Sequence, residues 1–223
     1  MTKFAIIVAA GSGERFSGNI PKQFVLLKGL PILMHSINAF FNFDNSIKII
    51  VVLSDNQTHT WKELCSKYEF EINHKIVNGG QTRFESVKNG LSTINEDSLI
   101  AIHDGVRPLV SNTTIKNCFS TAQMLGNAIP VVEPVDSVRE IGFNESFSLK
   151  RNNLRLIQTP QVFKTEILKI AYQQNYNSTF TDDANVVESI GEKINLVEGN
   201  IENIKITTNT DLIIAEALIN NFE

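Results

Sequence analysis

Short apolar runs alternate with helical segments along this chain, and this alternation constrains its fold more than any other feature. The runs have the length of buried strands and fall at Phe4–Ala9, Ile47–Leu53, Lys75–Val77, Leu99–Ile102 and Ala128–Val132. Between them, apolar side chains recur at helical spacing, as Leu33, Ile37 and Phe40 do after Pro31. The alternation predicts an α/β fold in which helices cover both faces of a mainly parallel sheet.

Length and charge limit the domain organisation and the partners. The 223 residues suit one domain with a substantial core, and we expect a single domain over 1–223. A net charge of −4 provides no bulk attraction for nucleic acid or an anionic membrane, so local cations have to hold any polyanionic ligand.

The cysteines and the length of the apolar runs indicate where in the cell the protein is expected. Cys65 and Cys118 lack the spacing of a disulfide framework or a zinc site, which indicates reduced thiols. Every apolar run is shorter than the roughly 18 residues of a membrane span. We therefore expect a cytoplasmic protein that does not bind a membrane.

The pattern changes between about residues 134 and 156. Asp136–Glu140 and Ser146–Arg151 are short, polar and extended, and Gly142–Glu145 separates them. This predicts a β-hairpin that leaves the main sheet. Because two strands alone bury little area, we expect this arm to pack against a second copy of the chain, with a mobile excursion as the alternative.

Polar clusters follow the predicted strands, at the sheet edge where open α/β folds bind ligands. The first runs from Val8 to Phe16 and continues at Pro21–Gln23. Its glycines leave backbone N–H groups accessible to an anion, and its cations are Arg15 and Lys22. The second, Gly79–Ser86, places two glycines before a helix whose first turn fits a capping box. Together they suggest a site for a nucleoside triphosphate, although an ordinary turn explains either one alone.

Two further clusters add a carboxylate and cations. In His103–Pro108, Asp104 ends a predicted strand and suits Mg²⁺, while Arg107 suits a phosphate. An Asp–Arg surface pair is the plain alternative. The segment Ile204–Thr208 is strand-like and contains Lys205, which needs an anion if it points inward and otherwise extends to solvent.

Two common nucleotide motifs do not fit this loop. The dinucleotide fingerprint needs a glycine where Phe16 stands, and a P-loop needs a Gly-Lys-Ser/Thr sequence that the loop lacks. Dinucleotide redox chemistry and ordinary phosphate-loop hydrolysis are therefore disfavoured.

Six motifs taken in order resemble those of the 2-C-methyl-D-erythritol 4-phosphate cytidylyltransferase family. They are Ala9–Arg15, Pro21–Gln23, Gly79–Gly80 with Arg83 and Ser86, His103–Pro108, Thr159–Gln161 and Asn203–Thr207. The resemblance implies a Rossmann-like α/β fold with a protruding β-arm and a homodimer. It also implies that CTP and the sugar phosphate react, with Mg²⁺, to 4-diphosphocytidyl-2-C-methyl-D-erythritol and pyrophosphate in non-mevalonate isoprenoid synthesis.

The resemblance implies roles for individual residues. Arg15 and Lys22 would bind the triphosphate and stabilise the transition state. Lys205 would contact the α-phosphate, and Asp104 would lie at the metal and substrate site. The nucleotide would also bind at Ala9, Ala10, Gly11, Gly13, Gly79, Gly80, Ser86 and Gly105. Methylerythritol phosphate would bind at Arg107, Ser137, Arg151, Thr159 and Thr181, with Arg151 supplied by the partner's arm.

Three positions depart from the family pattern. Gln81 stands where an acidic residue is common, and Ser137 keeps the hydroxyl of the commoner Thr. Gly105 replaces the commoner Ala and leaves a backbone contact possible.

Two alternative functions follow from the same residues. A ribitol 5-phosphate cytidylyltransferase shares the fold and most motifs, although Arg151 and Thr181–Asp183 favour methylerythritol phosphate. A non-catalytic nucleotide-binding protein would be expected to lack at least one of the four charged residues Arg15, Lys22, Asp104 and Lys205, and all four are present.

Overall fold

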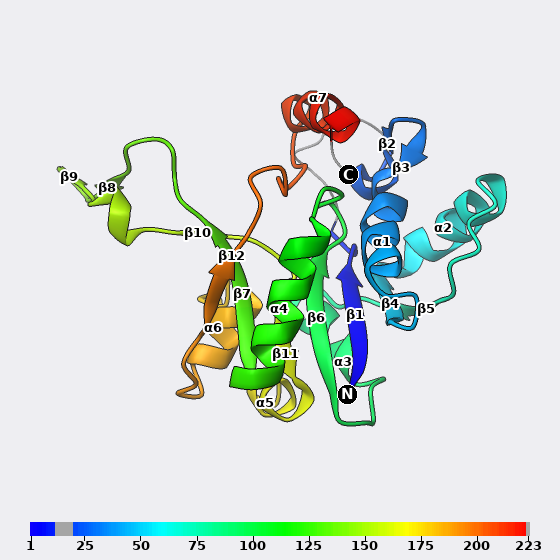
Figure 1. The fold of residues 1–223 in the computed structure, drawn as a ribbon, viewed down its shortest axis with the longest axis horizontal. Helices are drawn as coiled ribbons and strands as arrows, with labels where there is room; N and C mark the ends of the chain where they lie inside the picture. Colours follow the sequence, from blue (N-terminus) through cyan, green and yellow to red (C-terminus); the bar gives the residue numbers. More distant parts are fainter. Residues whose placement is uncertain (12–19, 222–223) are drawn as a thin grey trace.

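The computed structural model describes residues 1–11 and 20–221, and a single large sheet organises them (Figure 1). Its strand order is β10-β7-β11-β6-β1-β4-β5, and β12 pairs with β7. The parallel part consists of β5 (His74–Asn78), β4 (Lys48–Leu53), β1 (Thr2–Val8) and β6 (Ser98–Asp104). The other strands are β7 (Asn127–Val132), β10 (Leu156–Ile157), β11 (Gln161–Lys164) and β12 (Leu196–Glu198). The expected mainly parallel α/β sheet is confirmed.

Helices cover both faces of the sheet because neighbouring strand residues point to opposite sides. In β1, Ala5 and Ile7 join one apolar cluster, and Phe4 and Ile6 join the other. The first cluster lies under α1 (Ile32–Phe43), α2 (Asp55–Lys67) and α4 (Asn112–Leu125). The second lies under α3 (Arg83–Leu91), α5 (Thr165–Ala171) and α6 (Asp183–Glu188).

A third, smaller cluster lies near the carboxyl ends of the strands. It packs Leu27, Val106 and Ile206 beneath α7 (Asn209–Leu218), the red helix in Figure 1. The shorter elements outside the arm strands are η1 (Lys22–Phe24), β2 (Leu26–Leu27), β3 (Leu30–Pro31), η2 (Arg151–Asn153) and η3 (Ile219–Asn221). None of the helices in the described part has the length and apolar character to cross a membrane.

The predicted hairpin is present and leaves the main sheet. β8 (Arg139–Ile141) pairs antiparallel with β9 (Ser146–Ser148), and the Gly142 N–H closes the turn by donating to the Glu145 carbonyl at 2.8 Å. Figure 1 shows the pair at the end of a long excursion, away from the α-helices. Phe143 at its tip is 99% exposed.

Local structure differs from expectation at two places. The segment 204–208 is not a strand, and its backbone is joined to the loop after β6 by the Ile206 N–H, which donates to the Val106 carbonyl at 2.9 Å. Burial of Ile206 under α7 explains the apolar spacing without strand pairing. Sequence patterning also missed β11, because a four-residue strand carries too little periodicity to be read.

Candidate active site

Two adjoining pockets open at the carboxyl ends of β1 and β6. The larger encloses about 370 Å³, and its walls are the end of β1, the turn at Lys22, the segment 80–86 and Asp104. The smaller encloses about 150 Å³ and includes Arg107, Thr159 and Thr181. Arg83, Asp104 and Lys205 line both pockets. The boundary between the pockets is therefore a cluster of charged side chains.

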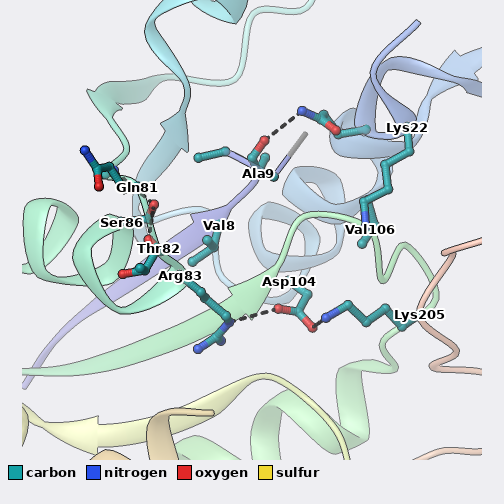
Figure 2. A pocket seen from close by; sticks show the side chains of 14 residues that line it. Val8, Ala9, Lys22, Gln81, Thr82, Arg83, Ser86, Asp104, Val106 and Lys205 are labelled. Atoms are coloured by element: carbon teal, nitrogen blue, oxygen red, sulfur yellow. Dashed lines mark hydrogen bonds and ion pairs between the residues drawn. The ribbon is translucent and has the colours of Figure 1, made fainter. Parts of the chain in front are cut away.

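Asp104 is the centre of this cluster. Its carboxylate lies 3.0 Å from the Lys205 ammonium, 3.4 Å from Arg107 Nε and 3.5 Å from Arg83 Nε. Burial on its own would raise the pKa of Asp104, but the charges of Arg83, Lys205 and Arg107 outweigh it and hold that pKa well below its usual value. Figure 2 shows Arg83 and Lys205 approaching the carboxylate from opposite sides.

Two buried side chains, His103 and Thr159, fix the backbone of Asp104. Burial lowers the pKa of His103 to about 4, so its ring is neutral at pH 7. His103 Nε2 lies 3.0 Å from the Arg107 carbonyl oxygen, which only accepts, so the ring proton is on Nε2. His103 Nδ1 therefore accepts from the Thr159 hydroxyl at 3.0 Å, and that hydroxyl accepts from the Asp104 N–H at 3.1 Å. This arrangement uses the single hydroxyl proton of Thr159.

Close backbone packing forms the opposite wall of the larger pocket. A Cβ at Gly79 would lie 2.5 Å from Ala10 Cβ, and one at Gly80 would overlap Glu85. The Gly80 N–H donates to Ser86 Oγ at 3.1 Å, and that hydroxyl donates to the Thr82 carbonyl at 2.9 Å. Glycine is needed at both positions because Gly79 packs between Ala10 and Ser86, and Gly80 packs against the Glu85 side chain.

Lys22 is held in place by its neighbour in the chain. Gln23 is 1% exposed, and its amide donates to the Ala9 carbonyl and to Gln57 Oε1, both at 2.8 Å. These bonds fix the turn that carries Lys22 against the end of β1. Figure 2 shows Lys22 on the same side of the pocket as Val106.

Comparison with known proteins decides the family. A family model described as 2-C-methyl-D-erythritol 4-phosphate cytidylyltransferase matches residues 3–221. The chain belongs to this family. A protein of that name from Phocaeicola vulgatus is 50% identical over 219 residues, which cover 98% of this chain and 100% of that protein. One from Bacteroides fragilis is 48% identical with the same coverage.

Solved structures with a similar fold are named as enzymes of the same cytidylyltransferase family. The crystal structure of 4-diphosphocytidyl-2C-methyl-D-erythritol synthase from Anaerococcus prevotii has a TM-score of 0.83 at 28% identity, and the match covers 98% of each chain. The 2-C-methyl-D-erythritol 4-phosphate cytidylyltransferase from Thermus thermophilus has a TM-score of 0.80 at 29% identity, covering 99% of this chain and 100% of that one.

Most site residues expected from the cytidylyltransferase resemblance do converge. The larger pocket is lined by Ala9, Ala10, Gly11, Lys22, Gly80, Ser86, Asp104 and Lys205. The smaller pocket is lined by Arg107, Thr159 and Thr181. Gly79 and Gly105 do not line either pocket and support the walls instead. A Cβ at Gly105 would lie 3.0 Å from both Ala9 Cβ and Leu33 Cδ1, so glycine suits this position.

Two expected residues lie away from the pockets, and two others are not among the described residues. Ser137 and Arg151 lie on the arm and line neither pocket, and Arg151 Nη1 donates to the Val135 carbonyl at 2.5 Å. Gly13 and Arg15 fall outside the described residues. The cytidylyltransferase resemblance assigns Arg151 to the partner's site, and this role stays a prediction.

Arg83 and Gln23 were not assigned roles from the sequence, although both occur within the quoted motifs. A glutamine between an expected pocket lysine and Phe24 signals a buried amide that bonds to backbone. An arginine at the first position of a capped helix, where a negative charge is favoured, signals a nearby carboxylate.

The donor set fits a magnesium ion that arrives with a nucleotide. Among the described residues there is no group of three or more His, Cys, Asp or Glu side chains placed to hold a metal. Within the described ranges, Asp104 is the one acidic side chain that lines the larger pocket. Mg²⁺ is commonly held by one or two carboxylates together with substrate phosphates and water, which matches this arrangement.

Proposed function

We propose that this chain transfers the cytidylyl group of CTP to 2-C-methyl-D-erythritol 4-phosphate at the Asp104 cluster, releasing pyrophosphate, in non-mevalonate isoprenoid synthesis. The observation that carries the proposal is the pair of pockets that share Arg83, Asp104 and Lys205. The larger suits the nucleotide and the smaller the sugar phosphate, so the reacting groups meet at the shared wall. The family comparisons support this acceptor over ribitol 5-phosphate.

The reaction is an in-line displacement at phosphorus. A phosphate oxygen of the acceptor forms a bond to the α-phosphorus of CTP, and the bond from that phosphorus to the bridging oxygen of pyrophosphate breaks. Two anions have to approach each other, so catalysis consists mainly of alignment and neutralisation of charge. In our proposal Lys205 contacts the α-phosphate, and Lys22 with Arg15 binds the triphosphate and stabilises the leaving pyrophosphate.

Asp104 would hold Mg²⁺ beside the triphosphate, and the bound ion would neutralise charge on the phosphate oxygens. The loop at Gly79–Ser86 would read the cytosine edge through fixed backbone N–H and carbonyl groups. This is supported by the contact of Ser86 with Gly80, which fixes the loop backbone at the pocket. Gly11, Ala9 and Ala10 would let the triphosphate approach the backbone at the end of β1.

Methylerythritol phosphate would bind in the smaller pocket, with Arg107 and Thr181 as direct contacts. Thr159 would contribute through its remaining lone pair, since its proton is donated to His103. Ser137 and Arg151 would complete the pocket from the arm of the partner subunit. We therefore propose a homodimer formed through the arm at residues 134–156, as one domain per chain.

Exposed apolar side chains support the dimer. On the arm and at its base, Val135 is 81% exposed, Ile141 is 76% exposed and Leu156 is 53% exposed. A two-stranded hairpin with such side chains is only marginally stable in water on its own, so a second copy would cover them.

A cytoplasmic location is also proposed, supported by the free thiols of Cys65 and Cys118.

Substrate choice tests the proposed function directly. We expect purified protein with Mg²⁺ to release pyrophosphate from CTP in the presence of methylerythritol phosphate, and far more slowly from ATP, GTP or UTP. A coupled pyrophosphate assay with each nucleotide against methylerythritol phosphate and ribitol 5-phosphate measures this. Turnover with CTP and ribitol 5-phosphate alone would contradict the proposed acceptor.

Arg151 tests the role of the arm. We expect Arg151→Ala to raise the KM for methylerythritol phosphate by about 10-fold or more, because a charge-assisted contact to phosphate is lost. The KM for CTP and the dimer mass in light scattering should not change. Arg155→Ala is the matched control, since Arg155 also belongs to the arm and pairs with Glu133 at 3.1 Å. An unaltered KM for the sugar phosphate would remove Arg151 from the site.

A further inference from the structure

The Arg83 guanidinium binds a second carboxylate besides Asp104. Nη1 donates to Asp183 Oδ1 at 2.9 Å and Nη2 donates to Asp183 Oδ2 at 2.7 Å. This is a bidentate pair, the geometry that orients an arginine most firmly. Arg83 Nε faces Asp104 Oδ1 at 3.5 Å. The side chain therefore spans two carboxylates instead of pointing a free fork into a pocket.

Asp183 is a well-defined anchor for this arginine. It is 0% exposed, and the Tyr172 hydroxyl donates to its Oδ1 at 2.6 Å. Burial raises the pKa of Tyr172, as does the charge of Asp183, so the phenol keeps its proton and remains a donor. Tyr172 in turn stacks on Phe84, the residue after Arg83, with ring centroids 4.7 Å apart.

The anchor also belongs to the chain segment that lines the smaller pocket. Thr181 and Asp182 line that pocket, and Asp183 follows as the first residue of α6. Gln161 fixes this segment, since its amide donates to Asp182 Oδ2 at 2.9 Å and accepts from the Ala184 N–H at 2.8 Å. Arg83, at the start of α3, thus ties the wall of the smaller pocket to Asp104 and to the larger pocket.

We propose that Arg83 is a positioning residue, held by Asp183 and Tyr172, which sets the orientation of the Asp104 carboxylate between the two pockets. The inference rests on the proposed function of Asp104 and assigns Arg83 no direct contact with substrate. Burial alone would lower the pKa of Arg83, but Asp183 and Asp104 outweigh it and raise that pKa, so the side chain stays charged. Asp104 then has Arg83 as a fixed cation on one side, and its other cationic neighbours are Arg107 and the more exposed Lys205.

Arg83→Lys tests this proposal because it keeps the charge and removes the fork. A lysine cannot contact both Asp183 oxygens and Asp104 together, so the Asp104 carboxylate loses one of its fixed cationic neighbours. We expect kcat to fall by about 10- to 100-fold, as for loss of other supporting contacts around a functional group. The KM values for CTP and for methylerythritol phosphate should each change by less than about threefold, because Arg83 makes no substrate contact. Arg155→Lys, at an exposed ion pair, is the matched control.

A double variant separates positioning from a general loss of stability. If Arg83 acts through Asp104, Arg83→Lys should lower kcat by less than about twofold further in an Asp104→Asn background. Full multiplication of the two effects would overturn the proposal. So would an Arg83→Lys enzyme with raised KM and normal kcat, since that identifies a direct substrate contact.

Tyr172→Phe gives a second and milder test with all charges retained. Loss of one hydrogen bond to Asp183 should lower kcat by about two- to fivefold, with both KM values unchanged. Unchanged kcat in both single variants would overturn the proposal. Turnover by the unmodified enzyme in the same assay establishes the proposed function independently, so failure of that function and failure of this inference are distinguishable.

Discussion

Replacing Lys22 by alanine is expected to lower kcat by about 10²- to 10³-fold, the effect of removing one preorganised charge from a transition state. Lys22 lines the larger pocket beside the end of β1, where the triphosphate is proposed to bind. Charge accumulates on the leaving pyrophosphate as its bond to the α-phosphorus breaks. An ammonium group there therefore stabilises the transition state more than it stabilises the bound substrate.

Steady-state pyrophosphate release at saturating CTP and methylerythritol phosphate measures this effect. Lys62→Ala removes the same charge from the exposed face of α2 and should leave kcat unchanged. Lys22→Arg should recover part of the lost rate because the charge is retained on a side chain of different shape. If Lys22→Ala turns over at the normal rate, Lys22 has no part in catalysis.

The contacts that hold the Lys22 turn in place show which features of the site can be predicted from the sequence and which cannot. The motif Pro21–Gln23 places a cation near the first predicted strand, and this follows from chain proximity alone. The buried amide of Gln23 bonds to Gln57, 34 positions away, and that partner depends on how α2 packs. The cation of this motif could therefore be predicted from the sequence, whereas the contacts that support it could not.

The same distinction applies to the fold. Alternating apolar runs predicted β1, β4, β5, β6 and β7, since each is long enough to show its pattern. β11 was missed, yet it lies between β6 and β7 in the sheet and pairs antiparallel with both. That insertion brings Thr159 beside the end of β6, where its hydroxyl accepts from the Asp104 N–H. Long-range pairing of a short strand leaves no periodic signal in sequence.

Arg83 is a clearer case still. The sequence places it in a motif with Gly79 and Ser86, but its partner Asp183 lies 100 positions further along the chain. Complementary charges at such separation cannot be matched without the fold, because 20 Lys and Arg and 24 Asp and Glu allow many pairings. The resemblance to a known family implied roles for substrate contacts, whereas positioning contacts between distant segments depend on the fold.

Asp104→Asn is the second substitution with a large expected effect, and it acts on both rate and stability. We expect kcat to fall by about 10²- to 10³-fold, because the proposed Mg²⁺ loses its carboxylate and Lys205 loses the partner that aims it. Asp55→Asn is the control, since Asp55 is exposed at the start of α2 and lines neither pocket. Normal turnover by Asp104→Asn would exclude the carboxylate from the mechanism.

The stability of Asp104→Asn depends on pH in a defined direction. The variant leaves cations without their shared anion, so the free energy of unfolding at pH 7 should fall by about 3 kcal/mol, the low end for a broken buried pair. The low end applies because Arg83 keeps Asp183 and the Lys205 side chain is 39% exposed. Since the folded pKa of Asp104 lies below its unfolded pKa, its contribution is present above the unfolded value of about 3.9 and declines below it. Urea titrations should therefore show that the difference in free energy of unfolding between the unmodified protein and Asp104→Asn decreases as the pH falls below about 4. A difference that stays constant between pH 7 and pH 3 would show that the ionised carboxylate does not stabilise the fold.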